Sequence, residues 1–200
     1  MKKFVFAVFF LISLSSLYGE TQLELEKSII SHIVNFQYND CNYLCDKYIN
    51  IYSNNYFGYN AKGIINMYLY NLTEAIIYFN RALGKLNDSS DKGNKVAILK
   101  NLALINLTLK NYLLATNEYL ECIKEKPSEK GYAYLGIAGI YCKISNYIQA
   151  KKYYLQALPF IIDKRLINVL YYGLSEVANE TIRQPRDSSE TTGTRGRPSS

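Results

Sequence analysis

The chain from about residue 22 to residue 182 repeats apolar residues at helical spacing. In the stretch TEAIIYFNRAL, Ala75, Phe79 and Ala82 are spaced four and then three residues apart. Residues with this spacing share one face of an α-helix. Small side chains at both ends of the face allow another helix to come close, and the ring fills the space between them. The pattern predicts a helix that packs tightly against its neighbours.

The same face recurs along the chain. The intervals between the leading alanines, Ala75, Ala115 and Ala150, are 40 and 35 residues. Periods of this size are typical of stacked helical arrays. The matching faces consist of Ala115, Tyr119 and Cys122, then Ala150, Tyr154 and Ala157, and, in a weaker form, Cys41, Cys45 and Tyr48.

Each of these helices follows another predicted helix and a short turn, which reads YNLTE, LKNYL or ISNYI. In the preceding helix a bulky residue stands four positions before a small one, as in Tyr59–Gly63, Leu99–Ala103 and Tyr134–Ala138. Thr73, just before Glu74, is predicted to cap the helix that follows its turn. Asn106 is predicted to lie packed inside its helix pair.

Together these residues resemble the tetratricopeptide repeat, a family of helix-turn-helix repeats. The resemblance implies an all-α fold, an α-solenoid of about four repeats. It covers residues 22–164, with copies at roughly 22–55, 56–89, 96–129 and 131–164. Departures from the family pattern are Ile29 at a small-residue position, Lys62 at an apolar one, the absence of tryptophan, and extra residues near Asn87–Asn94. The last helical segment, residues 165–182, lacks the Ala-aromatic-Ala face and is predicted to cap the array.

The two ends of the chain differ from its middle. Lys2 and Lys3, the apolar run Phe4–Leu14 and small residues up to Gly19 have the order of a secretory signal peptide over residues 1–19. The run is about half the ~20 residues that a membrane span needs. We therefore expect an exported protein, in a bacterial periplasm or secreted, without a stable membrane span after cleavage. Residues 183–200 are rich in Pro, Gly, Ser, Thr and Arg and are predicted to be a disordered tail, of native or foreign origin.

Charge argues against nucleic acid as a partner. The net charge is +6, of which Lys2 and Lys3 supply +2 and the tail supplies another +2. The predicted folded part is therefore nearly neutral, whereas a nucleic-acid-binding domain needs a basic face of its own. The sequence also has no glycine-rich phosphate-binding motif, and we expect no cofactor.

Candidate chemistry is limited to one place. The single histidine, His32, is predicted to lie across its hairpin from Cys41, with Cys45 one turn away. Such a group could hold zinc or act through a thiol, although all three positions also suit core packing. Cys142 is predicted to face the groove. We expect the four cysteines to be free or only partly paired, since a repeat stack already has a continuous core.

The resemblance implies a binding face formed by the first helix of each pair. Only Lys100, Asn101 and Asn60 could contribute to the carboxylate clamp known in this family, so we expect apolar anchors that hold a partner peptide or helix. The predicted function is a non-enzymatic protein-binding module, an adaptor or assembly factor. The alternatives are the site at His32, Cys41 and Cys45, with no metal expected, and a self-assembling structural protein. The predicted groove residues are Asn60, Ile64, Met67, Lys100, Leu104, Leu107, Tyr132 and Leu135, with Gly139 and Cys142 beside them.

Overall fold

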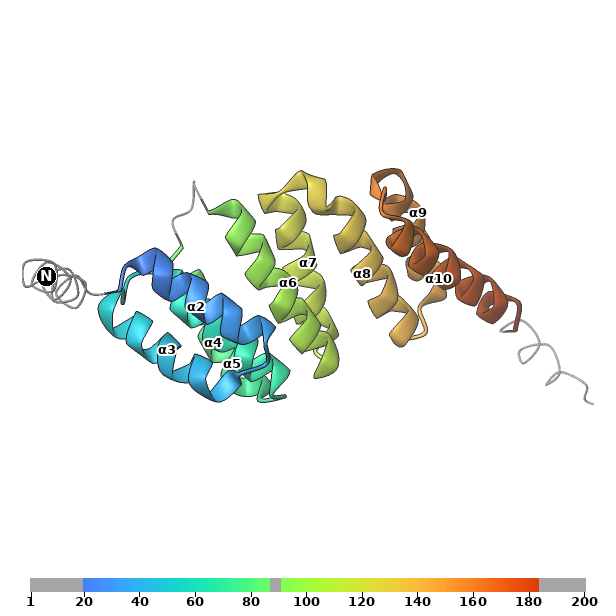
Figure 1. The fold of residues 1–200 in the computed structure, drawn as a ribbon. Coiled ribbons are helices and arrows are strands. Elements are labelled where there is room, and N and C mark those ends of the chain that lie inside the picture. The colour runs from blue at the N-terminus through green and yellow to red at the C-terminus, as the bar shows by residue number, and fades with distance from the viewer. Residues whose placement is uncertain (1–19, 87–90, 184–200) are drawn as a thin grey trace, which may run out of the picture. The chain divides into compact units, whose positions relative to one another are not determined.

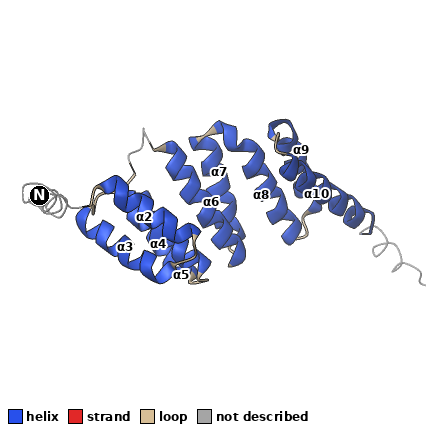
Figure 2. Cartoon of the chain, in the orientation of Figure 1, coloured by secondary structure: helices blue, strands red, loops and turns tan. Residues whose placement is uncertain are grey.

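The computed structural model describes residues 20–86 and 91–183, and every regular element in these two ranges is a helix (Figures 1 and 2). The chain divides into two compact units, residues 1–90 and 91–200. No described helix is long and apolar enough to cross a membrane. The predicted signal peptide and all of the predicted tail except Arg183 lie outside the described residues.

Unit 1 contains two helix pairs. They are α2 (Gln22–Val34) with α3 (Tyr38–Ile51), and α4 (Tyr56–Tyr68) with α5 (Leu72–Leu83). α3 also packs on α4, so the second helix of one pair contacts the first helix of the next. The core between them consists of Leu25, Ile29, Cys41, Cys45, Tyr48, Ala61 and Ile65.

Unit 2 contains two further pairs and a last helix, α10 (Lys164–Arg183). The pairs are α6 (Lys92–Thr108) with α7 (Tyr112–Glu125), and α8 (Lys130–Lys143) with α9 (Tyr147–Ala157). Short 3₁₀ turns, η1 (Pro127–Glu129) and η2 (Leu158–Phe160), follow α7 and α9. α7 packs on α8 and α9 on α10, which continues the order of contacts seen in unit 1.

The small-aromatic-small face is the core of each pair, as the spacing predicts. Ala75, Phe79 and Ala82 are fully buried, and the ring of Phe79 lies against Gly63 of α4, where a Cβ atom would come within 2.6 Å of it. The ring of Tyr119 lies equally close to Gly136 of α8. These glycines are required because the ring occupies the space of their missing side chain.

The four hairpin turns share one backbone conformation. Each contains a residue other than glycine with positive φ, between 58° and 62°: Phe36, Tyr70, Lys110 and Ser145. The next residue donates its backbone N–H to a carbonyl five positions earlier, as Asn71 does to Asn66 at 2.8 Å and Asn111 does to Asn106 at 2.8 Å. This is the closing hydrogen bond of a Schellman motif.

The fold class is confirmed: the described chain is a series of helix-turn-helix pairs closed by a C-terminal helix. One local prediction is wrong. Thr73 is not the cap of α5, because the helix begins at Leu72 and Asn71 occupies the N-cap position. The extra residues near Asn87–Asn94 fall in the connection between α5 and α6 and in the first turn of α6, and residues 87–90 among them lie outside the described ranges.

Candidate partner-binding surface

In unit 2, α6 and the start of α8 are joined by Lys100. Its Nζ lies 4.2 Å from the centre of the Tyr132 ring and 3.2 Å from a carboxylate oxygen of Glu129. The predicted cation of the groove is therefore held by an ion pair and an aromatic face inside the protein. Lys100 positions Tyr132 rather than offering a free charge to a partner.

Two positions on this face are open. Leu104 on α6 is 49% exposed, although it is aliphatic and follows the core residue Ala103. Gly139 lies in the middle of α8, and no heavy atom comes within 4 Å of the place where its Cβ would be. Glycine inside a helix costs roughly 1 kcal/mol relative to alanine, and packing within the protein does not require it here. The backbone of α8 is therefore accessible to close approach at Gly139.

Two predicted groove residues pack at the core of the α8–α9 pair. Leu135 is only 8% exposed and packs with Ala138, Ala150 and Tyr154 in the core of the α8–α9 pair. Cys142 also packs against this core, with its Sγ 3.7 Å from the Tyr154 hydroxyl. The open side of α8 instead presents Tyr132, Gly139 and Lys143.

Leu107 is half-buried at the end of the same face. It packs against the α6–α7 core and also lines a pocket of about 310 Å³ with Thr108, Lys110, Tyr112 and Lys143. Lys110 and Lys143 stand at the carboxyl ends of α6 and α8, where positive charge complements the helix dipole. Their position therefore has a structural reason that needs no ligand.

In unit 1 the predicted residues lie on α4 and are partly buried. These are Asn60, Ile64 and Met67. The Oδ1 atom of Asn60 is buried and has no hydrogen-bond partner among the described residues.

Sequence reasoning missed the first helix of the first pair. Ile30 on α2 stands 34 residues before Ile64 and is 49% exposed, and Leu23 on the same helix is 58% exposed. A step back by one repeat length from Ile64 would have found Ile30. The equivalent position in the repeat is thus apolar in the first three pairs, as Ile30, Ile64 and Leu104, and is Gly139 in the fourth.

The metal hypothesis for His32, Cys41 and Cys45 is not supported. No group of three metal-ligating side chains that could hold an ion occurs within the described ranges. His32 Nδ1 lies 2.8 Å from the carbonyl of Ser28, and the Cys41 thiol donates to the carbonyl of Ile29 at 3.5 Å. Both side chains form hydrogen bonds with the backbone of their own hairpin.

The thiols of Cys45 and Cys122 are poorly suited to nucleophilic chemistry. All four cysteines are free, and only Cys142 is not fully buried. The hydrogen bond that Cys45 donates to Cys41 and burial both raise the pKa of Cys45. Burial raises the pKa of Cys122 to about 12. The thiolate is the reactive form, so neither of these two thiols is activated.

Repeat three contains a buried polar pair at the place where repeat four contains two stacked tyrosines. Asn106 is 4% exposed, as predicted, and donates to Oε1 of Glu118 at 2.9 Å. The other carboxylate oxygen of Glu118 is buried without a partner in the described structure, and burial raises the pKa of this carboxyl. At the equivalent positions Tyr141 and Tyr153 stack with ring centres 5.4 Å apart.

Comparison with known proteins identifies the fold. No protein-family model matches the sequence, and no curated protein matches it. Among solved structures, one of MamA is similar with a TM-score of 0.62 and 19% identity, over 74% of this chain and 82% of that one. A second, the APC/C hetero-tetramer Cut9–Hcn1, gives a TM-score of 0.64 and 18% identity over 77% of this chain and 30% of that one. A third, a double mutant of MamA from RS-1, gives a TM-score of 0.63 and 12% identity, over 82% of this chain and 93% of that one. MamA and Cut9 are tetratricopeptide repeat proteins. The chain has the tetratricopeptide-repeat fold.

Proposed function

We propose that this protein is an exported, non-enzymatic binding module that holds an apolar peptide or helix of a partner protein on the open face of its first helices. The observation that carries the proposal is the combination of Leu104 and Gly139. Leu104 is an exposed aliphatic side chain, and Gly139 leaves the backbone of α8 uncovered. The two residues stand on the same face of unit 2, at equivalent positions of consecutive repeats.

The chemistry of this face suits an apolar ligand. The charge of Lys100 is neutralised internally, because Glu129 pairs with it. Tyr132, which is 37% exposed, adds an aromatic surface at Lys100, one helical turn before Leu104 on α6. Such anchors bind the apolar side of an amphipathic helix or an extended segment. The fold supports a binding role by analogy, since the Cut9–Hcn1 structure is a complex of two proteins.

The test is capture of the partner by the full chain and by two variants. Leu104→Glu places a charge at the exposed anchor, and Gly139→Leu fills the open space on α8. Each should abolish capture of the specific partner while the helical circular dichroism remains. Tyr43→Glu on α3 is the matched control, because Tyr43 is 71% exposed but lies on a second helix.

Two outcomes of this capture experiment would contradict the proposed binding face. Unchanged capture by Leu104→Glu and Gly139→Leu would show that the partner binds elsewhere. Equal loss with Tyr43→Glu would show that the effect is not specific to this face. Export is tested separately, by the mass of the chain recovered from the producing cell: cleavage near Gly19 is expected.

A further inference from the structure

The side of α9 that faces away from the core has an unusual composition. Ala150, Tyr154 and Ala157 are buried on one side of this helix. Ile148, Lys151, Lys152 and Leu155 lie on the other side, at helical spacing, and we call these four residues the α9 outer face. Ile148 is 80% exposed and Leu155 is 50% exposed.

Exposed apolar side chains continue beyond the end of α9. Leu158 is 42% exposed, Phe160 is 46% exposed and Ile162 is 92% exposed. Scattered exposed aliphatic residues are normal on a protein surface, but a contiguous group marks an interaction site. This group follows one short segment of the chain, residues 147–162.

The same segment is purely basic. Residues 147–162 contain Lys151 and Lys152 and no acidic residue. Neither ammonium group has an ion pair or hydrogen bond within the described residues. The neighbouring pairs of lysine and glutamate in unit 2, such as Lys95 with Glu125, show that ion pairing is otherwise common there.

The positions equivalent to Ile148 and Leu155 in the other repeats carry exposed aliphatic residues in unit 2 but not in unit 1. On α7 they are Leu113 and Leu120, which are 74% and 43% exposed. On α3 they are Asn39 and Asp46, and on α5 they are Thr73 and Asn80, all polar and exposed. The repeat fold alone therefore does not require aliphatic residues at these positions.

We propose that the α9 outer face, with Leu158 and Ile162, contacts the surface of a membrane that contains anionic lipids. Side chains that are 80% or 92% exposed stand away from their neighbours and form no wall of a groove for a peptide. A bilayer surface receives such protruding side chains at the level of its headgroups. The two unpaired lysines complement anionic headgroups, which attract basic residues near the surface. The contact lies on the back of the second helices and leaves the proposed partner-binding face free.

The chain has no tryptophan, so a single tryptophan can report on this face alone. Leu155→Trp in the full chain should show a blue-shifted emission and quenching by brominated acyl chains when vesicles of phosphatidylglycerol and phosphatidylcholine are added. Tyr43→Trp, at an exposed site on the outer side of α3, is the matched control and should not respond. Replacing both Lys151 and Lys152 by Gln should weaken the response of Leu155→Trp roughly 30-fold.

Three results would overturn the proposal. The first is no spectral change at position 155 with anionic vesicles. The second is an equal change with pure phosphatidylcholine, which would remove the role of charge. The third is a blue shift without vesicles that grows with protein concentration, because a second copy of the chain would then cover the face. Circular dichroism of each variant checks that the helices are intact.

Discussion

In the two units, the aromatic residue on the second helix of the last pair packs against different elements. In unit 1 the ring of Phe79 lies on Gly63, which belongs to the first helix of its own pair. In unit 2 the ring and hydroxyl of Tyr154 lie on Gly173 of α10, the helix that follows the pair. The same position in the repeat thus stabilises the inside of a hairpin in one unit and the joint between successive elements in the other.

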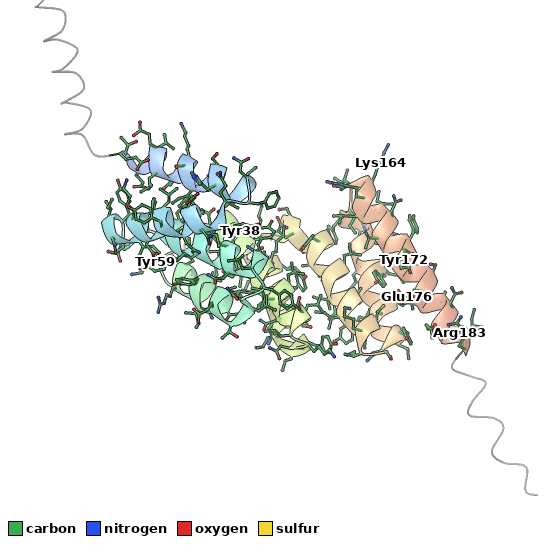
Figure 3. All side chains as sticks on the ribbon, turned by 60° about the horizontal axis from the view of Figure 1, so that its bottom comes forward. Tyr38, Tyr59, Lys164, Tyr172, Glu176 and Arg183 are labelled. Carbon is green, nitrogen blue, oxygen red and sulfur yellow. The ribbon has the colours of Figure 1, made fainter. Side chains whose placement is uncertain are left out.

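This difference explains how α10 caps unit 2 although it lacks the face of a second helix. Its buried residues are Leu170, Gly173 and Val177, on the side toward α9. Their spacing matches Ala133, Gly136 and Ile140 on α8, where Gly136 receives the ring of Tyr119. α10 is therefore equivalent to the first helix of a further repeat. Its side away from α9 is exposed: Tyr172, labelled on α10 in Figure 3, is 72% exposed.

Removal of either aromatic ring should have the largest effect. Phe79→Ala and Tyr154→Ala should each lower the free energy of unfolding by about 3–5 kcal/mol, because a large buried side chain leaves a cavity. Limited proteolysis should detect cleavage in α4 and α5 for the first variant, and in α9 and α10 for the second. Cleavage of both units in both variants would show that the two aromatic residues do not act locally.

Replacing each of two glycines by alanine should change the stability of unit 2 in opposite directions. Gly173→Ala should destabilise unit 2 by about 1–3 kcal/mol, because the new Cβ overlaps the Tyr154 ring. Gly139→Ala on α8 should stabilise by up to about 1 kcal/mol, because its surroundings are open. Urea denaturation of both variants measures the difference. A stable Gly173→Ala variant would contradict the close packing of α10 on Tyr154.

The ion pair between the buried Lys62 and the exposed Asp46 of unit 1 offers a third test. Lys62 is 9% exposed and its Nζ lies 2.5 Å from Asp46 of α3, whose side chain is 58% exposed. Burial alone would lower the pKa of Lys62, but the hydrogen bond and charge of Asp46 raise it. Asp46→Asn should lower stability by about 1–2 kcal/mol, less than for a fully buried pair because water still reaches the carboxylate.

The matched control for this pair is Lys62→Met. Leucine and isoleucine stand at the equivalent positions Leu102 and Ile137, so an apolar side chain fits the site. Thermal unfolding of Lys62→Met should be close to that of the unchanged chain, and adding Asp46→Asn to it should have little further effect. A full additional loss in the double variant would show that Asp46 acts through another contact.

The smallest effect is expected at Glu118, in unit 2. Its folded pKa is raised by burial, so ionisation is less favourable in the folded chain than in the unfolded chain, and stability falls as the pH rises through that pKa. Glu118→Gln should raise the melting temperature at pH 7 by about 2–4 °C. The gain should shrink toward about pH 4, where the unchanged carboxyl is protonated. A gain that is the same at both pH values would mean that charge is not the cause.

The helices and their repetition could be predicted from the sequence. The small-aromatic-small face has a single periodicity, that of an α-helix, and few other structures fit it. The open face was harder to predict. α8 is apolar on nearly all sides, with Ala133, Leu135 and Ile137 all buried. Spacing alone could not decide that Leu135 lies inward while Gly139 lies outward. The pairing of Lys100 with Glu129 joins residues 29 positions apart, and nothing local in the sequence indicates it.

The four hairpin turns have a consequence for how the chain folds. Each closes with a hydrogen bond across five residues, around Phe36, Tyr70, Lys110 or Ser145, without help from a distant segment. Contacts that are close in sequence form quickly, and repeats that contact only their neighbours can begin to fold at any position. The protein should therefore have several equivalent folding nuclei, and the order in which its hairpins form should be set by their individual stabilities rather than by the position of a single nucleus.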